Sequence, residues 1–117
     1  MKFRAHILPF AKSDSVRVVP VAVEDTDSID AALEEVFAIG NGMRESAEWR
    51  ARSLSVGDVV EAVDGPHAGK KWVCLMAGWA PASDELCAKL AEVEFSDRGR
   101  VIADHPPGSM VIGYLSP

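Results

Sequence analysis

The residues of this sequence whose types could do chemistry gather in one segment, Arg52-Ser-Leu-Ser-Val-Gly-Asp-Val-Val60. The chemistry of serine hydrolases needs a serine nucleophile that is held on a strand-to-helix elbow or in an equivalent catalytic triad. The sequence contains no GxSxG, and Ser53 and Ser55 precede a predicted strand instead. We therefore expect these serines to satisfy backbone groups of a turn.

Asp58 is the carboxylate best placed for general acid–base catalysis, since it follows Gly57 at the start of that strand. Gly-Asp is also a turn dipeptide, in which the aspartate accepts hydrogen bonds from backbone amides. The turn interpretation is favoured. A small enzyme working through Asp58 ranks third among the hypotheses for function.

Four basic residues can form a cluster beside this segment. Arg50 and Arg52 flank Ala51 just before the two serines, and Lys70 and Lys71 lie at the start of the next predicted strand. One interpretation is a contact with an anion or nucleic acid, as in a PUA-like module. The other is ion pairing with the neighbouring acids, which are in excess and favour this interpretation. Those acids are Glu45, Glu48, Asp58 and Glu61.

Three tryptophans could in principle supply a stacking platform for single-stranded nucleic acid. Trp72 and Trp79 lie in one predicted strand at positions of opposite parity, so we expect them on opposite faces. Trp49 is expected to anchor residues 43–52 to the core, whether these form a short helix or a loop.

No metal or cofactor site is predicted. His6, His67 and His105 lie in separate segments without ligand spacing. Cys74 and Cys87 belong to no CxxC pair and are expected to be buried free thiols. The glycines are spaced for turns and helix ends, and no phosphate-binding motif is present.

Size and charge narrow the class of protein. The 117 residues suit a single domain spanning 1–117, and no apolar run is long enough for a membrane span. The broken apolar stretch at the N-terminus does not resemble a secretory signal, so we expect a cytoplasmic protein. The net charge of −6 disfavours general nucleic-acid binding.

The acidic residues between positions 24 and 35 have two interpretations. The favoured one is a solvated helix face with acids near the helix N-terminus. The more specific interpretation is an acidic patch that docks on a basic surface of a partner protein. The helix carries this patch as Asp30, Glu34 and Glu35.

The clearest predicted element is this acidic amphipathic helix. Ser28 or Asp27 can cap its start, and Gly40 or Gly42 can end it. Its apolar stripe consists of Ile29, Ala32, Leu33, Val36 and Phe37. A second helix is predicted to begin after Ser83, with acids in its first turn.

Short apolar runs predict strands at 2–10, 16–23, 59–63, 71–79, 100–103 and 110–115. The first two form a plausible hairpin around a turn at 12–15, and Pro20 argues for an edge position or a local break in the second strand. The strand at 71–79 is apolar on both parities, which is typical of a central strand covered on both sides. Consecutive strands pair as hairpins, so we expect an α+β fold with a mainly antiparallel sheet and two main helices packed on it.

One part of the sequence resembles the YodL-like domain and related small proteins of actinobacterial genomes, plasmids and phages. The resemblance lies in the segment Arg52–Val60, which is followed by Lys71-Trp-Val-Cys and then by Gly78-Trp79. Those proteins carry an RS(L/M/T)SVxDV core, of which RSLSVGDV here is an instance. The resemblance covers about Val16 to Trp79. It implies no assigned activity, but it favours an origin in a mobile element.

Together these observations favour a small, soluble, non-enzymatic binding protein that contacts a host or element-encoded macromolecule. A protein partner is expected through the acidic face, and a homo-oligomer is an open alternative because edge strands can pair between subunits. The runner-up is a nucleic-acid-binding module. The candidate partner-binding residues are Asp30, Glu34, Glu35, Arg50, Arg52 and Asp58.

Overall fold

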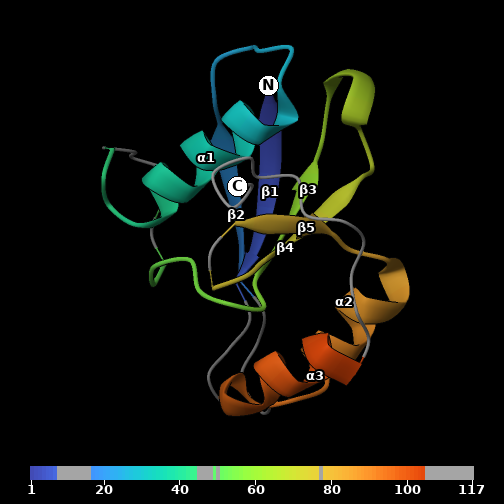
Figure 1. The fold of residues 1–117 in the computed structure, drawn as a ribbon. Helices are drawn as coiled ribbons and strands as arrows, with labels where there is room; N and C mark the ends of the chain where they lie inside the picture. The colour runs from blue at the N-terminus through green and yellow to red at the C-terminus, as the bar shows by residue number, and fades with distance from the viewer. Residues whose placement is uncertain (8–16, 45–48, 50, 77, 105–117) are drawn as a thin grey trace, which may run out of the picture.

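The computed structural model describes residues 1–7, 17–44, 49, 51–76 and 78–104 (Figure 1). Within them, five strands form one antiparallel sheet in the order β2-β1-β3-β4-β5. The strands are β1 (Lys2–Ile7), β2 (Arg17–Ala22), β3 (Val59–Ala62), β4 (Lys71–Cys74) and β5 (Trp79–Pro81). The helices are α1 (Ile29–Gly40), α2 (Asp84–Ala91) and α3 (Arg98–Asp104), with 3-10 turns at Gly65–His67 and Phe95–Asp97. The predicted α+β class is confirmed.

Helix α1 covers one face of the sheet. The Ser28 hydroxyl accepts a hydrogen bond from the Ala31 amide at 3.3 Å, which satisfies one of the free amides at the helix start. The apolar stripe of α1 packs on the inward side chains of β1, β2, β3 and β4. The buried members of this main core are Phe3, Ala5, Ile7, Val19, Val21, Ala32, Leu33, Val36, Leu54, Val60, Ala62, Trp72, Cys74 and Trp79.

Helices α2 and α3 pack on the opposite face, over β3, β4 and β5. Val59, Val73 and Ala80 point to this side because strand residues alternate between faces. They form a second core with Leu86 and Leu90 of α2. The central position predicted for the strand beginning at residue 71 is therefore confirmed for β4.

Strand β2 lies at one edge of the sheet, as the proline in it predicts. Among the described residues, Pro20 pairs with Arg4 of β1 and with no strand on its other side. The hairpin of β1 and β2 is also confirmed, whereas the predicted turn at 12–15 lies outside the described residues. The same holds for the predicted strand at 110–115 and for residues 45–48 and 50.

The single strand predicted over 71–79 is wrong, because it is divided by a tight turn. The Leu75 amide donates to the Gly78 carbonyl at 2.9 Å, and Gly78 adopts a φ of 99°, which favours glycine. The chain reverses there, so Trp72 and Trp79 lie in the same core and not on opposite faces.

The strand predicted at 100–103 is also wrong, since these residues belong to α3. Val101 and Ile102 favour a strand by intrinsic preference. In the structure both are half-buried against the second core, and this packing outweighs the local preference. The fold therefore carries a third helix in addition to the two expected.

Candidate functional site

Asp58 is fully buried and held by Arg52. Arg52 Nη1 donates to Asp58 Oδ2 at 2.7 Å, and Nη2 donates to Oδ1 at 2.8 Å, in the two-bond geometry that suits guanidinium and carboxylate. The Ser55 amide donates to Oδ2 at 2.9 Å. The Asp58 side chain is 0% exposed, whereas that of Arg52 keeps 19% exposure. The turn role predicted for Asp58 is confirmed.

A second arginine packs beside this pair. Arg98, the first residue of α3, is only 1% exposed. Burial lowers the pKa of its guanidinium, the Asp58 carboxylate opposes that change, and Arg52 adds to it. Gly57 lies directly against its aliphatic chain, since a Cβ atom at Gly57 would lie 2.7 Å from Arg98 Cδ. This cluster ties α3 to the start of β3.

The chemistry open to this cluster is limited by burial. A catalytic carboxylate has to reach the proton that it transfers, directly or through one water. Asp58 has no exposed surface, and both of its oxygens accept hydrogen bonds from the Arg52 segment. The geometry therefore favours a structural role for Asp58, and Arg52 serves the same role as its ion-pair partner.

Of the four predicted basic residues, the three that the structure describes do not form one patch of unpaired charges. Arg52 binds Asp58, and Lys71 Nζ donates to Asp84 Oδ1 at 2.9 Å. That contact raises the pKa of Lys71. Lys70 is exposed, and Arg50 lies outside the described residues. Lys70 and Lys71 instead line a groove of about 570 Å³ between β4 and the start of α2.

The acidic residues of α1 lie in different surroundings. Glu35 is paired with Arg44 at 2.8 Å on the surface. Glu34 is exposed and borders a small pocket of about 240 Å³ that is lined also by Phe37, Met43 and Trp79. Asp30 lies in the first turn and is half-buried.

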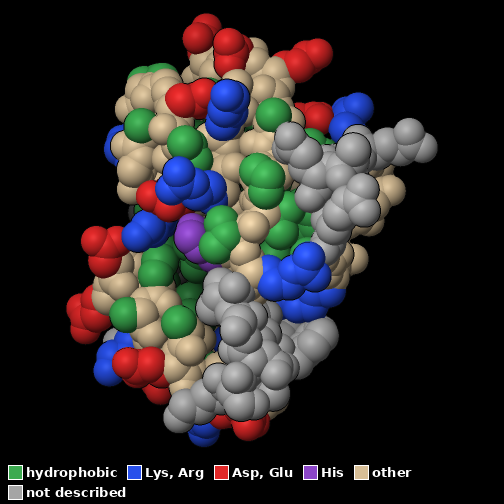
Figure 2. All heavy atoms as spheres, turned by 180° about the vertical axis from the view of Figure 1, so that it is seen from behind, with side chains coloured by type: hydrophobic (Ala, Val, Ile, Leu, Met, Phe, Trp, Pro, Cys, Tyr) green, Lys and Arg blue, Asp and Glu red, His purple; other side chains and the backbone are tan. Residues whose placement is uncertain are grey.

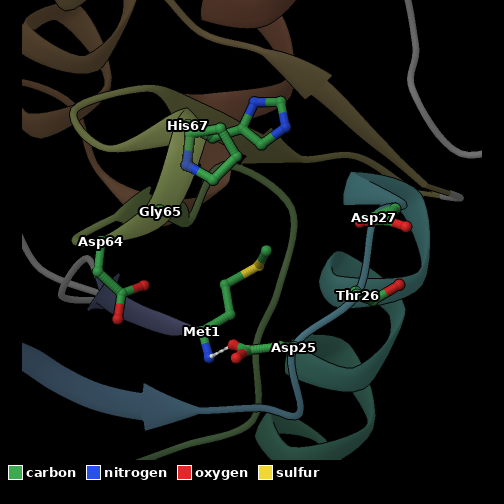
Figure 3. A pocket seen from close by; sticks show the side chains of 8 residues that line it. Met1, Asp25, Thr26, Asp27, Asp64, Gly65 and His67 are labelled. Carbon is green, nitrogen blue, oxygen red and sulfur yellow. Dashed lines mark hydrogen bonds and ion pairs between the residues drawn. The ribbon is translucent and has the colours of Figure 1, made fainter.

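A larger open pocket of about 610 Å³ lies between the start of β1, the chain before α1 and the turn after β3 (Figure 3). Its carboxylates do not converge: Asp25 faces the Met1 amine at 2.6 Å, while Asp27 and Asp64 lie on opposite sides. Among the described residues, no group of three His, Cys, Asp or Glu side chains could hold a metal ion. His67 lies in the 3-10 turn and stacks edge-on against Trp72.

The surface that sequence reasoning missed is the sheet side opposite α1, over β1 and β2. Helices α2 and α3 pack only on the neighbouring part of this side, over β3 to β5. Figure 2 views the molecule from the side opposite to that of Figure 1 and shows hydrophobic side chains next to Lys and Arg side chains, with Asp and Glu side chains among them. We call this surface the open face. Its residues in the strands are Lys2, Arg4, Val18, Pro20 and Ala22, and Val63 joins them just after β3, where its amide donates to the Lys2 carbonyl.

The open face is exposed and partly apolar. Val18 is 54% exposed and Val63 is 38% exposed. His6 and Glu61 lie at its inner border, with 3.4 Å between His6 Nε2 and Glu61 Oε1. The signal was present in the sequence as the alternation of β2, where Val19 and Val21 are buried and their neighbours are exposed. Which of the two sets would be covered could not be seen without the helix positions.

A scan of protein-family models, a search of curated proteins and a search of solved structures each returned no match. The resemblance to the YodL-like domain remains a prediction. Within the described part of the chain, no helix has the length and apolarity needed to cross a membrane.

Proposed function

We propose that this protein is a non-catalytic binding domain that docks a protein partner on the open face. The observation that carries the proposal is that Val18, which pairs with His6, and Val63, which lies beside Lys2, are both exposed on the side of the sheet that also carries Arg4. Exposed apolar surface that is rimmed by polar side chains marks contact surfaces more often than single scattered apolar residues do.

The burial of Asp58 supports a non-catalytic role, because the best candidate for acid–base chemistry is occupied by its contacts with Arg52. The division of the basic residues weakens the nucleic-acid alternative, since Arg52 and Lys71 each bind a carboxylate. With the resemblance to proteins of mobile elements, the partner would be a host or element-encoded protein in the cytoplasm.

A second candidate is the acidic face of α1 docking on a basic protein. It is supported by Glu34, which lies beside the apolar pocket of Phe37, Met43 and Trp79. A lysine or arginine of a partner could lay its aliphatic stem in this pocket and its charge on Glu34. Glu34→Lys should then abolish capture, with Glu85→Lys on exposed α2 as the matched control.

The proposal is tested by comparing two exposed apolar positions. Val18→Glu places a charge on the open face, and Met76→Glu places one on the turn between β4 and β5, where Met76 is 94% exposed. Proteins captured from extracts of the source organism should be lost with Val18→Glu and retained with Met76→Glu. Identical capture by both variants and the wild type would overturn the proposal, provided that circular dichroism shows both variants to be folded.

A further inference from the structure

We infer that the partner segment recognised by the open face is an acidic amphipathic helix. This inference rests on the proposed function and adds the chemistry of the partner. It follows from three features of the open face: its shape, the spacing of its apolar side chains and the sign of its charges.

The shape is that of a sheet surface that none of the described helices covers. The opposite side of the same sheet is covered by α1, and the neighbouring part of this side is covered by α2 and α3. Helices cover sheet faces by burying an apolar stripe on the outward side chains of the strands. A helix supplied by a partner would complete the layer that α2 and α3 begin.

The apolar spacing fits a helix. Val18, Pro20 and Ala22 occupy alternate positions of β2 and so point to the same side. Together they span about 13 Å along the strand. Two turns of α-helix rise about 11 Å, so a stripe at i, i+4 and i+7 can match these three side chains.

The charges select an acidic helix. Arg4 lies between Pro20 on β2 and Glu61 on β3, and Lys2 lies beside Ala22. Both basic side chains are exposed. Glu61 is half-buried and faces His6, and the Asp64 carboxylate accepts a hydrogen bond from the Lys2 amide. Among the described residues, Lys2 and Arg4 are the exposed basic side chains next to the apolar strip. Carboxylates flanking the partner's apolar stripe would pair with them.

Single-stranded nucleic acid, which would also bring negative charge, is the less favoured occupant. Sheet surfaces that bind it present aromatic side chains on which bases stack. The apolar side chains of the open face are aliphatic, and Trp72 and Trp79 are buried in the main core on the other side. The apolar strip therefore suits leucine-like side chains better than bases.

The test uses two synthetic helical peptides of about 20 residues, long enough to hold a helix in water. One carries leucine on one face and glutamate on the other, and its twin has lysine in place of every glutamate. Binding to the full chain is followed by fluorescence anisotropy and located by NMR shifts. The acidic peptide should bind and shift Val18, Pro20 and Ala22, and the lysine twin should bind at least about tenfold more weakly.

Variants sharpen the test. Arg4→Glu should weaken the acidic peptide about tenfold or more and strengthen its lysine twin, because the sign of the surface is reversed. Arg100→Glu, on the exposed side of α3, is the matched control and should change neither. Equal binding of the two peptides, or binding of an oligothymidine without binding of the acidic peptide, would overturn the inference.

The inference about the acidic helix can be wrong even if the proposed docking function is correct. If neither peptide binds but Val18→Glu still loses a captured protein that Met76→Glu retains, the open face is a docking surface for another kind of segment. If Val18→Glu loses nothing, both fail together.

Discussion

Arg52 and Asp58 form a buried ion pair with two parallel hydrogen bonds, of 2.7 Å and 2.8 Å, at the entrance to β3. The pair lies within the motif that looks most like an active site in the sequence. Its carboxylate instead fixes the turn before β3 through the Ser55 amide and lies beside Arg98 of α3. The motif is thus a structural junction between a loop, a strand and a helix.

Asp58→Asn should lower the free energy of unfolding by about 3 kcal/mol, because it leaves a partly buried arginine without its countercharge. Urea denaturation measures the change. Asp84→Asn is the control, since Asp84 is paired with Lys71 but its side chain is 91% exposed. That substitution should cost about 0.5 kcal/mol or less. Equal losses for the two variants would contradict the structural role of Asp58.

Gly57→Ala should be more destabilising than Gly69→Ala. Both glycines have left-handed backbone angles, with φ of 92° and 88°, so both substitutions cost about 1 kcal/mol in backbone strain. At Gly69 nothing lies within 4 Å of the added Cβ, whereas at Gly57 the side chain of Arg98 must move. We expect a further loss of about 2 kcal/mol at Gly57, measured by thermal or urea unfolding. Equal losses would show that Arg98 does not pack there.

The thiols should resist alkylation near neutral pH. Burial raises the pKa of Cys74 to about 12, and it raises that of Cys87 as well, although Lys71 opposes the change there. Cys87 is half-buried and should react first, and Cys74 should react only when the chain unfolds. Mass spectrometry after timed alkylation at about pH 8 gives the order. Faster labelling of Cys74 would contradict the packing around β4.

Cys74 should also make stability depend on alkaline pH. In the unfolded chain its thiol ionises near pH 9, whereas in the folded chain it stays protonated until about pH 12. Deprotonation therefore favours the unfolded state, and the free energy of unfolding falls as the pH rises above 9. Cys74→Ala should show a shallower fall over this range, in urea titrations at several pH values. Parallel curves would indicate that Cys74 is accessible when folded.

Local patterns were sufficient to predict the elements whose periodicity is complete. The stripe of α1 with its Ser28 cap, the β1–β2 hairpin and the start of α2 at Ser83 were all predictable. Two assignments failed, one at a local turn inside an apolar run and one where a contact distant in the sequence decides the structure. Gly78 reverses the chain within an apolar run, and α3 forms where Val101 and Ile102 meet the second core.

The candidate site was predictable only in part. The sequence indicated that Arg52 would pair with a nearby acid and that Asp58 would serve a turn, and both are confirmed. The open face was not predictable, because alternation along β2 does not say which face a helix covers. The position of Arg98 beside Arg52 and Asp58 was not predictable either, because it depends on how α3 packs against the start of β3.

The central claim is that a protein partner docks on the open face, and site-specific photo-crosslinking tests it most directly. Val18 is replaced by p-benzoylphenylalanine in the full chain expressed in the source organism, and Met76 is replaced in a parallel strain. The account predicts a discrete crosslinked protein from position 18 that is absent from position 76. No adduct at position 18, or the same adducts from both positions, would contradict it.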